Sequence, residues 1–284
     1  GASDPMNIDE GSLTFWSTGF GSRGHIEGDG NGSSVSMRGG GVFFGLDGVW
    51  GDGWRAGVAA GYGRDVINQK SFLASADVDS YYAAAYAGGA IGPASLRLGA
   101  IHAFQDVETR RAVSFSTLQE NLTAGYDAST TQVFAEAAWR FDFDLVQFEP
   151  YANISYVNTK ADAFGERGGM AAVSSGSASH DQLYSTLGAR FSRDIAFEGM
   201  AGQAMFDIGW RHAYGDPAVE STLFYAGGQG FSVTSAAMAQ DVALINLGLR
   251  YDLNPAATLT FRYGAVFGAG MLDQSASAEL GVRF

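Results

Sequence analysis

The sequence lacks cysteine, which excludes a disulfide framework and a metal site built from thiolates. It also lacks a run of about 18 apolar residues, the length that a membrane-spanning helix needs. Proline is scarce, with 5 residues, and the 17 basic residues include only two lysines. With 30 acidic residues against these 17 basic ones, the net charge is −13, which argues against nucleic acid as a partner.

Glycine and aromatic residues are abundant instead. The chain has 40 Gly, 20 Phe, 12 Tyr and 5 Trp, a bias typical of proteins with many strands and turns. No Gly-X-Y period runs through the chain, so collagen is excluded. The aromatic content is also too high for a disordered chain.

The secondary structure is indicated by an alternation of apolar and polar residues with period two. At the C-terminus, Ala278, Leu280 and Val282 share one face, and Glu279 and Arg283 share the other. Such stretches run for about ten to eighteen residues, longer than the strands of most soluble proteins. Charges of both signs and many glycines occupy one face, and the other face is almost uncharged. This pattern predicts strands that are apolar outside and polar inside, as in outer-membrane barrels.

Twelve such strands are predicted, so the fold class is an all-β, transmembrane, antiparallel up-and-down barrel. Their approximate ranges are 12–26, 34–50, 54–68, 74–91, 94–110, 124–141, 145–160, 178–193, 202–214, 240–253, 257–269 and 275–284. Long connections, near 27–33, 69–73, 111–123, 161–177 and 215–239, alternate with short ones, which predicts extracellular loops at one end and periplasmic turns at the other. An even strand number places both chain ends on the periplasmic side. Residues 12–284 are expected to form the barrel, and residues 1–11 a tag remnant and a truncated linker.

The aromatic residues beside the short turns predict a periplasmic girdle, with the members Trp50, Trp54, Phe141, Tyr251 and Phe261. Trp16 and Trp210 are expected toward the other membrane interface. The segment Val35–Trp50 breaks parity, because Arg38 shares its parity with the apolar residues that follow. This predicts a β-bulge at Gly39-Gly40-Gly41.

The charged residues of the strands are expected to face inward, because a charge at the membrane midplane costs roughly 2–4 kcal/mol. The predicted lumen-lining residues are Arg38, Arg55, Arg97, Glu136, Arg140, Glu149, Arg190, Asp207, Arg211, Arg250, Arg262, Glu279 and Arg283. They either fill and hydrate the lumen in mutual pairs, or contact a chain that passes through it.

Several local patterns together resemble the C-terminal β-domain of classical autotransporters. They include Gly45-Leu46-Asp47-Gly48, Gly57–Gly63, Phe148-Glu149-Pro150-Tyr151-Ala152 and the ending Leu280-Gly281-Val282-Arg283-Phe284. The resemblance covers the chain from about Ser12 to Phe284. It implies an outer-membrane translocator that anchors an N-terminal passenger and helps to export it through the lumen.

The same resemblance implies further partners and roles. Phe284, with Val282 and Leu280 on its face, resembles the membrane-insertion signal read by the barrel-assembly machinery. Outer-membrane lipid, lipopolysaccharide and the passenger's own linker are the other expected partners, and the barrel is expected to be a monomer. The segment Asp216–Ala239 is either a hairpin that assists the passenger or an unstructured surface loop.

Catalysis, cofactors and metals are not expected. Gly19–Gly24 has the letters of a dinucleotide fingerprint but no helix after it, and Asp29–Ser33 lacks the glutamate that closes a calcium loop. The histidines His25, His102, His180 and His212 have no metal-ligand spacing. A passive channel or porin of another barrel family is the main alternative. An outer-membrane enzyme and a soluble β-sandwich are more remote.

Overall fold

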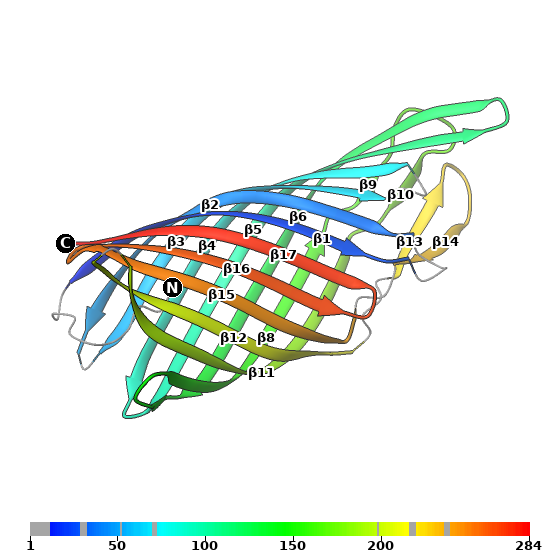
Figure 1. The fold of residues 1–284 in the computed structure, drawn as a ribbon. Helices are drawn as coiled ribbons and strands as arrows, with labels where there is room; N and C mark the ends of the chain where they lie inside the picture. The colour runs from blue at the N-terminus through cyan, green and yellow to red at the C-terminus, as the bar shows by residue number, and fades with distance from the viewer. Residues whose placement is uncertain are drawn as a thin grey trace.

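The protein is a closed antiparallel β-barrel of twelve long strands in the computed structural model (Figure 1). The structure describes residues 12–28, 33–51, 53–69, 73–197, 199–215, 220–235 and 239–284, without the side chains of Trp50 and Phe197. Within this part of the chain, no helix is long and apolar enough to cross a membrane. The barrel strands are β1 (Leu13–Ile26), β2 (Val35–Trp50), β3 (Trp54–Gln69), β4 (Ala74–Ile91), β5 (Ala94–Phe115), β6 (Leu118–Trp139), β8 (Gln147–Ala161), β11 (Ala178–Phe197), β12 (Met200–Tyr214), β15 (Asp241–Asn254), β16 (Ala257–Gly268) and β17 (Met271–Arg283).

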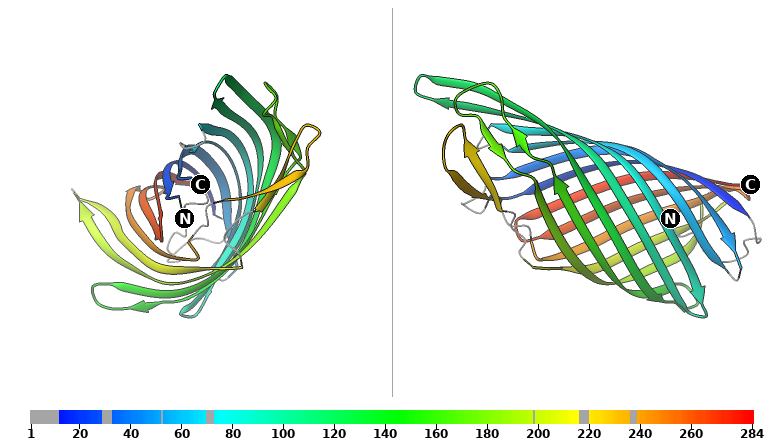
Figure 2. Two further views of the ribbon diagram at one scale, coloured as in Figure 1. Left: turned by 90° about the vertical axis from the view of Figure 1, so that its right-hand side faces the viewer. Right: turned by 180° about the vertical axis from the view of Figure 1, so that it is seen from behind.

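Each barrel strand pairs with its neighbours in the sequence, and β17 closes the barrel by pairing with β1. The backbone N–H and C=O groups of Leu13 bond to Phe284 at 3.2 and 3.0 Å, so the seam is closed up to the last residue. Both ends of the described chain therefore lie at the same end of the barrel (Figures 1 and 2). The pairing satisfies the backbone groups without leaving a free edge, which is the condition for crossing lipid with strands.

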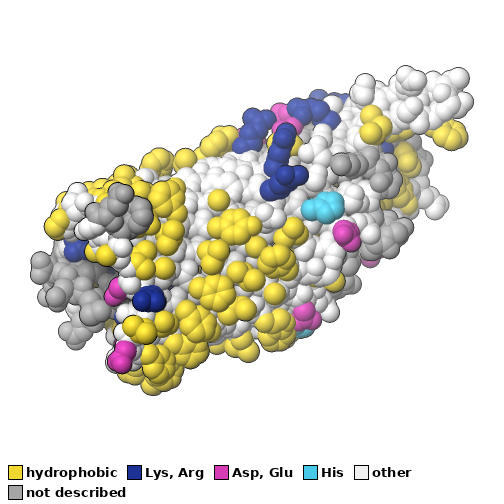
Figure 3. Space-filling model, viewed as in Figure 1, with side chains coloured by type: hydrophobic (Ala, Val, Ile, Leu, Met, Phe, Trp, Pro, Cys, Tyr) yellow, Lys and Arg dark blue, Asp and Glu magenta, His cyan; other side chains and the backbone are white. Residues whose placement is uncertain are grey.

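The outward face of the barrel carries a belt of uncovered apolar side chains. Val58, Phe104, Ile154 and Leu247 are all more than half exposed, and each lies on the outward parity of its strand. Figure 3 shows hydrophobic side chains spread over the middle of one side of the molecule and toward the C-terminal end. A belt this broad would be an aggregation hazard in water, whereas it matches a lipid bilayer.

The two ends of the barrel differ. At the plain end, tight turns connect the strands, together with the two-residue strand β7 (Phe141–Asp142). At the loop end, β9 (Phe164–Gly165), β10 (Val173–Ser175), β13 (Glu220–Tyr225) and β14 (Gly230–Thr234) form a separate four-stranded sheet. The hairpin β13–β14 lies within the segment Asp216–Ala239, for which the sequence left open a hairpin or an unstructured surface loop.

The predicted long loop at 111–123 is wrong. Strands β5 and β6 continue as one regular hairpin, which turns at residues 116–117 and projects beyond the rim of the barrel (Figure 2). Cross-strand pairing continues to Phe115 and Leu118. The alternation of apolar residues fades there because the outward face of the projecting hairpin no longer meets lipid. Its inward face is covered by the segment between β9 and β10, and Leu122 on that face is 1% exposed.

The predicted bulge at Gly39-Gly40-Gly41 is also wrong. The register of β2 is unbroken against both β1 and β3. Arg38 therefore keeps the outward parity of Val42 and Phe44 instead of turning inward. The parity break in the sequence instead marks the point at which the outward face of β2 changes from apolar to polar.

Candidate functional site

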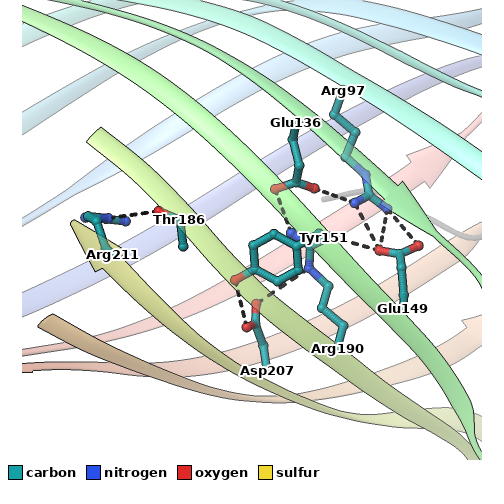
Figure 4. A network of polar contacts seen from close by, with 8 residues as sticks. All are labelled: Arg97, Glu136, Glu149, Tyr151, Thr186, Arg190, Asp207 and Arg211. Atoms are coloured by element: carbon teal, nitrogen blue, oxygen red, sulfur yellow. Dashed lines mark hydrogen bonds and ion pairs between the residues drawn. The ribbon is translucent and has the colours of Figure 1, made fainter. Parts of the chain in front are cut away.

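The inner wall of the barrel carries a network of five charged side chains on five consecutive strands (Figure 4). We call it the charged wall; its members are Arg97 on β5, Glu136 on β6, Glu149 on β8, Arg190 on β11 and Asp207 on β12. All five have the inward parity of their strands. Cross-strand register places Arg97 opposite Glu136, and Arg190 opposite both Glu149 and Asp207.

Arg190 lies at the centre of the charged wall. Its guanidinium bonds to Glu136 at 2.8 Å and to Glu149 at 2.8 Å, and its Nε lies 3.5 Å from Asp207. Arg97 binds Glu136 at 2.6 Å and Glu149 at 3.1 Å. Two arginines thus neutralise most of the charge of three acids, and each glutamate is bound by both arginines.

Tyr151 connects the charged wall to its surroundings. Its hydroxyl donates to Asp207 at 3.0 Å, and the Arg190 guanidinium stacks 4.0 Å from the centre of its ring. Farther along the same inner surface, the Arg211 Nε donates to the Thr186 hydroxyl at 3.4 Å. Charges that hold one another in fixed pairs leave a polar, water-accessible surface with little free charge.

A second polar network lies on β1 to β4. Arg55 donates to Asp47 at 2.7 Å, Tyr86 donates to the other oxygen of Asp47 at 2.8 Å, and the indole of Trp16 donates to the Tyr86 hydroxyl at 2.7 Å. Asp47 is 4% exposed and so depends on these partners. The expectation that Trp16 lies toward the loop-end interface is wrong, because Trp16 points into the lumen near the plain end.

Aromatic rings dominate this side of the lumen. We call this surface the aromatic wall; its members are Trp16, Phe20, Phe43, Tyr82 and Tyr86, all with inward parity. The ring of Phe43 contacts those of Phe20 and Tyr82, with centroids 5.6 and 5.0 Å apart. A cavity of about 500 Å³ adjoins the wall and is lined in part by Trp16, Phe43, Tyr86, Arg97 and Phe134.

The other predicted lumen residues have these positions. Arg262 lies 3.5 Å from Glu279, which also accepts from Thr18. Arg250 pairs with Asp252 at 3.1 Å, and Arg140, just after β6, with Asp142 at 3.0 Å. Arg283 is opposite Thr14 on the inward face. Of the thirteen predicted lumen-lining residues, Arg38 is the one whose position on its strand faces outward, so the prediction is wrong for it.

The predicted girdle residues lie around the plain end. Trp54 is paired with Trp50 at the β2–β3 turn, and the side chain of Trp50 is outside the described residues. Phe141 begins a ladder of outward rings that continues through Phe148, Phe191 and Phe206, with centroids 5.2–6.1 Å apart. Phe261 is 45% exposed on the outward face, and Tyr251, on β15, shares that outward parity. The three residues of the expected insertion signal also face outward: Leu280, Val282 and Phe284.

Within the described residues, the remaining motifs form no second site. Gly19–Gly24 lies inside β1, so the fingerprint opens no helix that could bind a pyrophosphate. Most of the calcium-like segment Asp29–Ser33 is outside the described residues. In the part of the chain that the structure describes, no three His, Asp or Glu side chains are grouped as metal ligands.

Sequence reasoning missed several inward residues, including those of the aromatic wall. Asp47, Tyr86 and Tyr151 belong to the networks but were absent from the predicted set. Parity could have found Asp47 and Tyr151, since Asp47 alternates with Leu46 and Tyr151 shares the parity of Glu149. The aromatic residues were instead expected at the membrane interfaces.

The closed barrel and its polar interior can be compared with known proteins. A family model, the autotransporter β-domain, matches residues 15–264. The chain belongs to this family. As an autotransporter β-domain it is an outer-membrane barrel, the translocator that anchors and exports a passenger domain. The loop end of the barrel is accordingly the extracellular end, and the plain end is periplasmic.

The relatives agree with this assignment. Two extracellular serine proteases of Serratia marcescens are 30% and 28% identical to the chain over 95% and 100% of its length. The chain spans only 26% and 27% of the length of these relatives, so the protease activity in their names is said of those whole proteins.

Solved structures show the same fold. The translocator domain of the autotransporter NalP from Neisseria meningitidis aligns with a TM-score of 0.78 and 17% identity, over 99% of this chain and 91% of that one. The β-domain of the Bordetella autotransporter Brka gives 0.66 and 18%, over 95% and 98%. The toluene transporter TodX of Pseudomonas putida gives 0.55 and 11%, over 98% and 90%, a likeness of fold alone.

Proposed function

We propose that the segment connecting the β-domain to its passenger runs through the lumen between the charged wall and the aromatic wall. The observation that carries this proposal is the difference in chemistry between the two walls. One presents paired charges on β5 to β12, and the other presents rings and glycines on β1 to β4. A segment with one polar and one apolar side would contact both walls favourably.

The pairing of the charges supports passage rather than tight binding. Each acid of the charged wall already has an arginine partner. A passing chain therefore meets paired charges, which bind it weakly, instead of a free charge that would bind it tightly.

The experiment compares two adjacent residues. A photo-crosslinking amino acid replaces either Phe43, which faces the lumen, or Phe44, which faces the lipid and is 51% exposed. The domain is expressed in a Gram-negative host behind a signal peptide, a tagged passenger that stalls during export, and a linker. Passenger adducts are expected from position 43 and not from position 44.

Other outcomes would decide against the proposal. Equal adducts from both positions, or none from position 43 while external protease removes the tag from intact cells, would mean that the passenger follows another route. A heat-modifiable barrel with the tag trapped in the periplasm would favour a passive channel, the alternative that the sequence left open.

A further inference from the structure

Two arginines lie directly opposite each other on the outer surface of the barrel. Arg23 on β1 is the cross-strand partner of Arg38 on β2, and both side chains are exposed with outward parity. Like charges in directly opposed positions destabilise a strand pair. Such an arrangement calls for a compensating anion.

The chain itself supplies no such anion among the residues that the structure describes, where neither Arg23 nor Arg38 has an acidic partner. Two other outward arginines behave differently, because Arg64 and Arg110 both bind Asp77, at 3.2 and 2.6 Å. Among the residues that the structure describes on this face, Arg23 and Arg38 are thus the arginines without an acidic partner.

A small polar cavity lies beside the pair. It has a volume of about 200 Å³ and is lined by Arg23, Gly24, His25, Ser34 and Ser36. His25 and Ser36 are themselves cross-strand partners, one pair farther from the membrane belt than Arg23 and Arg38. Guanidinium, hydroxyl and imidazole groups together are the donors that recognise phosphate oxygens.

The position of the pair along the barrel is that of a lipid headgroup. From the plain end toward the loop end, the outward residues of β2 are Leu46, Phe44, Val42, Gly40 and then Arg38. The arginine therefore lies at the loop-end margin of the apolar belt. In Figure 3 the Lys and Arg side chains on this side of the molecule gather mainly beyond the hydrophobic area. This margin is at the extracellular end, where the outer leaflet has its headgroups.

We propose that Arg23, Arg38 and the adjoining cavity bind the phosphate groups of an anionic lipid in the outer leaflet of the outer membrane. Guanidinium groups bind phosphate in a bidentate manner, and a basic residue beside an anionic bilayer attracts its headgroups. The binding depends on the location of the barrel and not on export, so it can be tested with the purified domain.

The experiment measures lipid binding by native mass spectrometry of the folded barrel released from detergent. The probes are bisphosphorylated lipid A, the same lipid without its phosphates, and inorganic pyrophosphate as a competitor. The variants are R23Q, R38Q and R23Q/R38Q. The matched control is R167Q/R193Q, which removes the same charge from two exposed arginines away from the site. Each variant is first checked for heat-modifiable mobility as a sign of folding.

The wild-type barrel should bind bisphosphorylated lipid A more tightly than the dephosphorylated lipid. Each single variant should lose about fivefold in affinity and the double variant about 25-fold, while R167Q/R193Q keeps the wild-type affinity. Equal binding of the two lipids, or an unchanged double variant, would overturn the proposal. Binding of pyrophosphate without any lipid preference would make this a site for free anions and would overturn the lipid assignment.

Discussion

Trp16 on β1 donates its indole N–H to the hydroxyl of Tyr86 on β4, at 2.7 Å and across the two strands between them. The two rings reach each other because each lies over a glycine of one of these two strands. Trp16 lies over Gly45 on β2, and Tyr86 lies over Gly57 on β3. Glycine is needed here because the backbone of the middle strands lies directly beneath the rings.

This arrangement predicts that Gly45→Ala destabilises the barrel by about 1–3 kcal/mol. A Cβ at Gly45 would lie 2.3 Å from the Trp16 ring, so the ring has to move and its bond to Tyr86 is lost. Gly19→Ala is the control, because a Cβ there has nothing within 4 Å. Urea unfolding in detergent, followed by tryptophan fluorescence, measures both. Equal midpoints for the two variants would contradict the prediction.

The charged wall predicts a ranking of two arginines. Arg190→Ala leaves three acids without their shared partner and should cost about 3–5 kcal/mol. Arg97→Ala should cost less, because Arg190 still binds both of the glutamates that Arg97 contacts. The two variants are ranked by the temperature at which each barrel changes from its folded to its unfolded mobility on gel electrophoresis. If Arg190→Ala is no worse than the exposed control Arg167→Ala, the network does not stabilise the barrel.

The projecting β5–β6 hairpin predicts a local effect at the extracellular end. Glu120 on β6 accepts the backbone N–H groups of Met170 and Ala171 at 2.8 and 2.9 Å, which holds the segment between β9 and β10 against the hairpin. Glu120→Ala should make this segment more sensitive to protease added to intact cells, with the barrel still folded. Glu108→Ala is the control, since Glu108 is exposed and pairs with Arg110 at the surface. Identical cleavage rates would show that the contact does not order the segment.

The C-terminus predicts two separable effects. Deletion of Phe284 removes both its ring and its backbone bonds to Leu13, whereas Phe284→Ala removes the ring alone. If the ring is part of the insertion signal, both variants should lower the assembled fraction in the outer membrane severalfold. Phe267→Ala, which removes another outward ring, should have little effect. A normal assembled fraction for Phe284→Ala would assign the role of Phe284 to the closure of the seam.

Part of the candidate site could be read from the sequence because one strand determines it. A strand has a side-chain period of two, so wherever one face meets lipid, a single apolar neighbour fixes the direction of every charge on that strand. Glu136 next to Ala135 and Asp207 next to Phe206 are examples. The outward position of Arg38 was missed because every strand charge was expected to face inward, and a bulge was predicted to turn this one. Arg38 keeps the parity of Val42 but lies beyond the apolar belt, where an outward charge does not meet hydrocarbon.

The strand positions, their even number and the polarity of each face were determined by the sequence itself, because they depend on neighbours one or two residues apart. Only the tertiary structure decided which charges meet. Arg97 and Arg190 are 93 positions apart, yet they share Glu136 because the closed barrel brings β5, β6, β8 and β11 side by side. The position of Trp16 was decided in the same way, since its ring turns inward over Gly45 of the neighbouring strand. Contacts of this kind depend on register and curvature across several strands, and these arise only when the sheet closes.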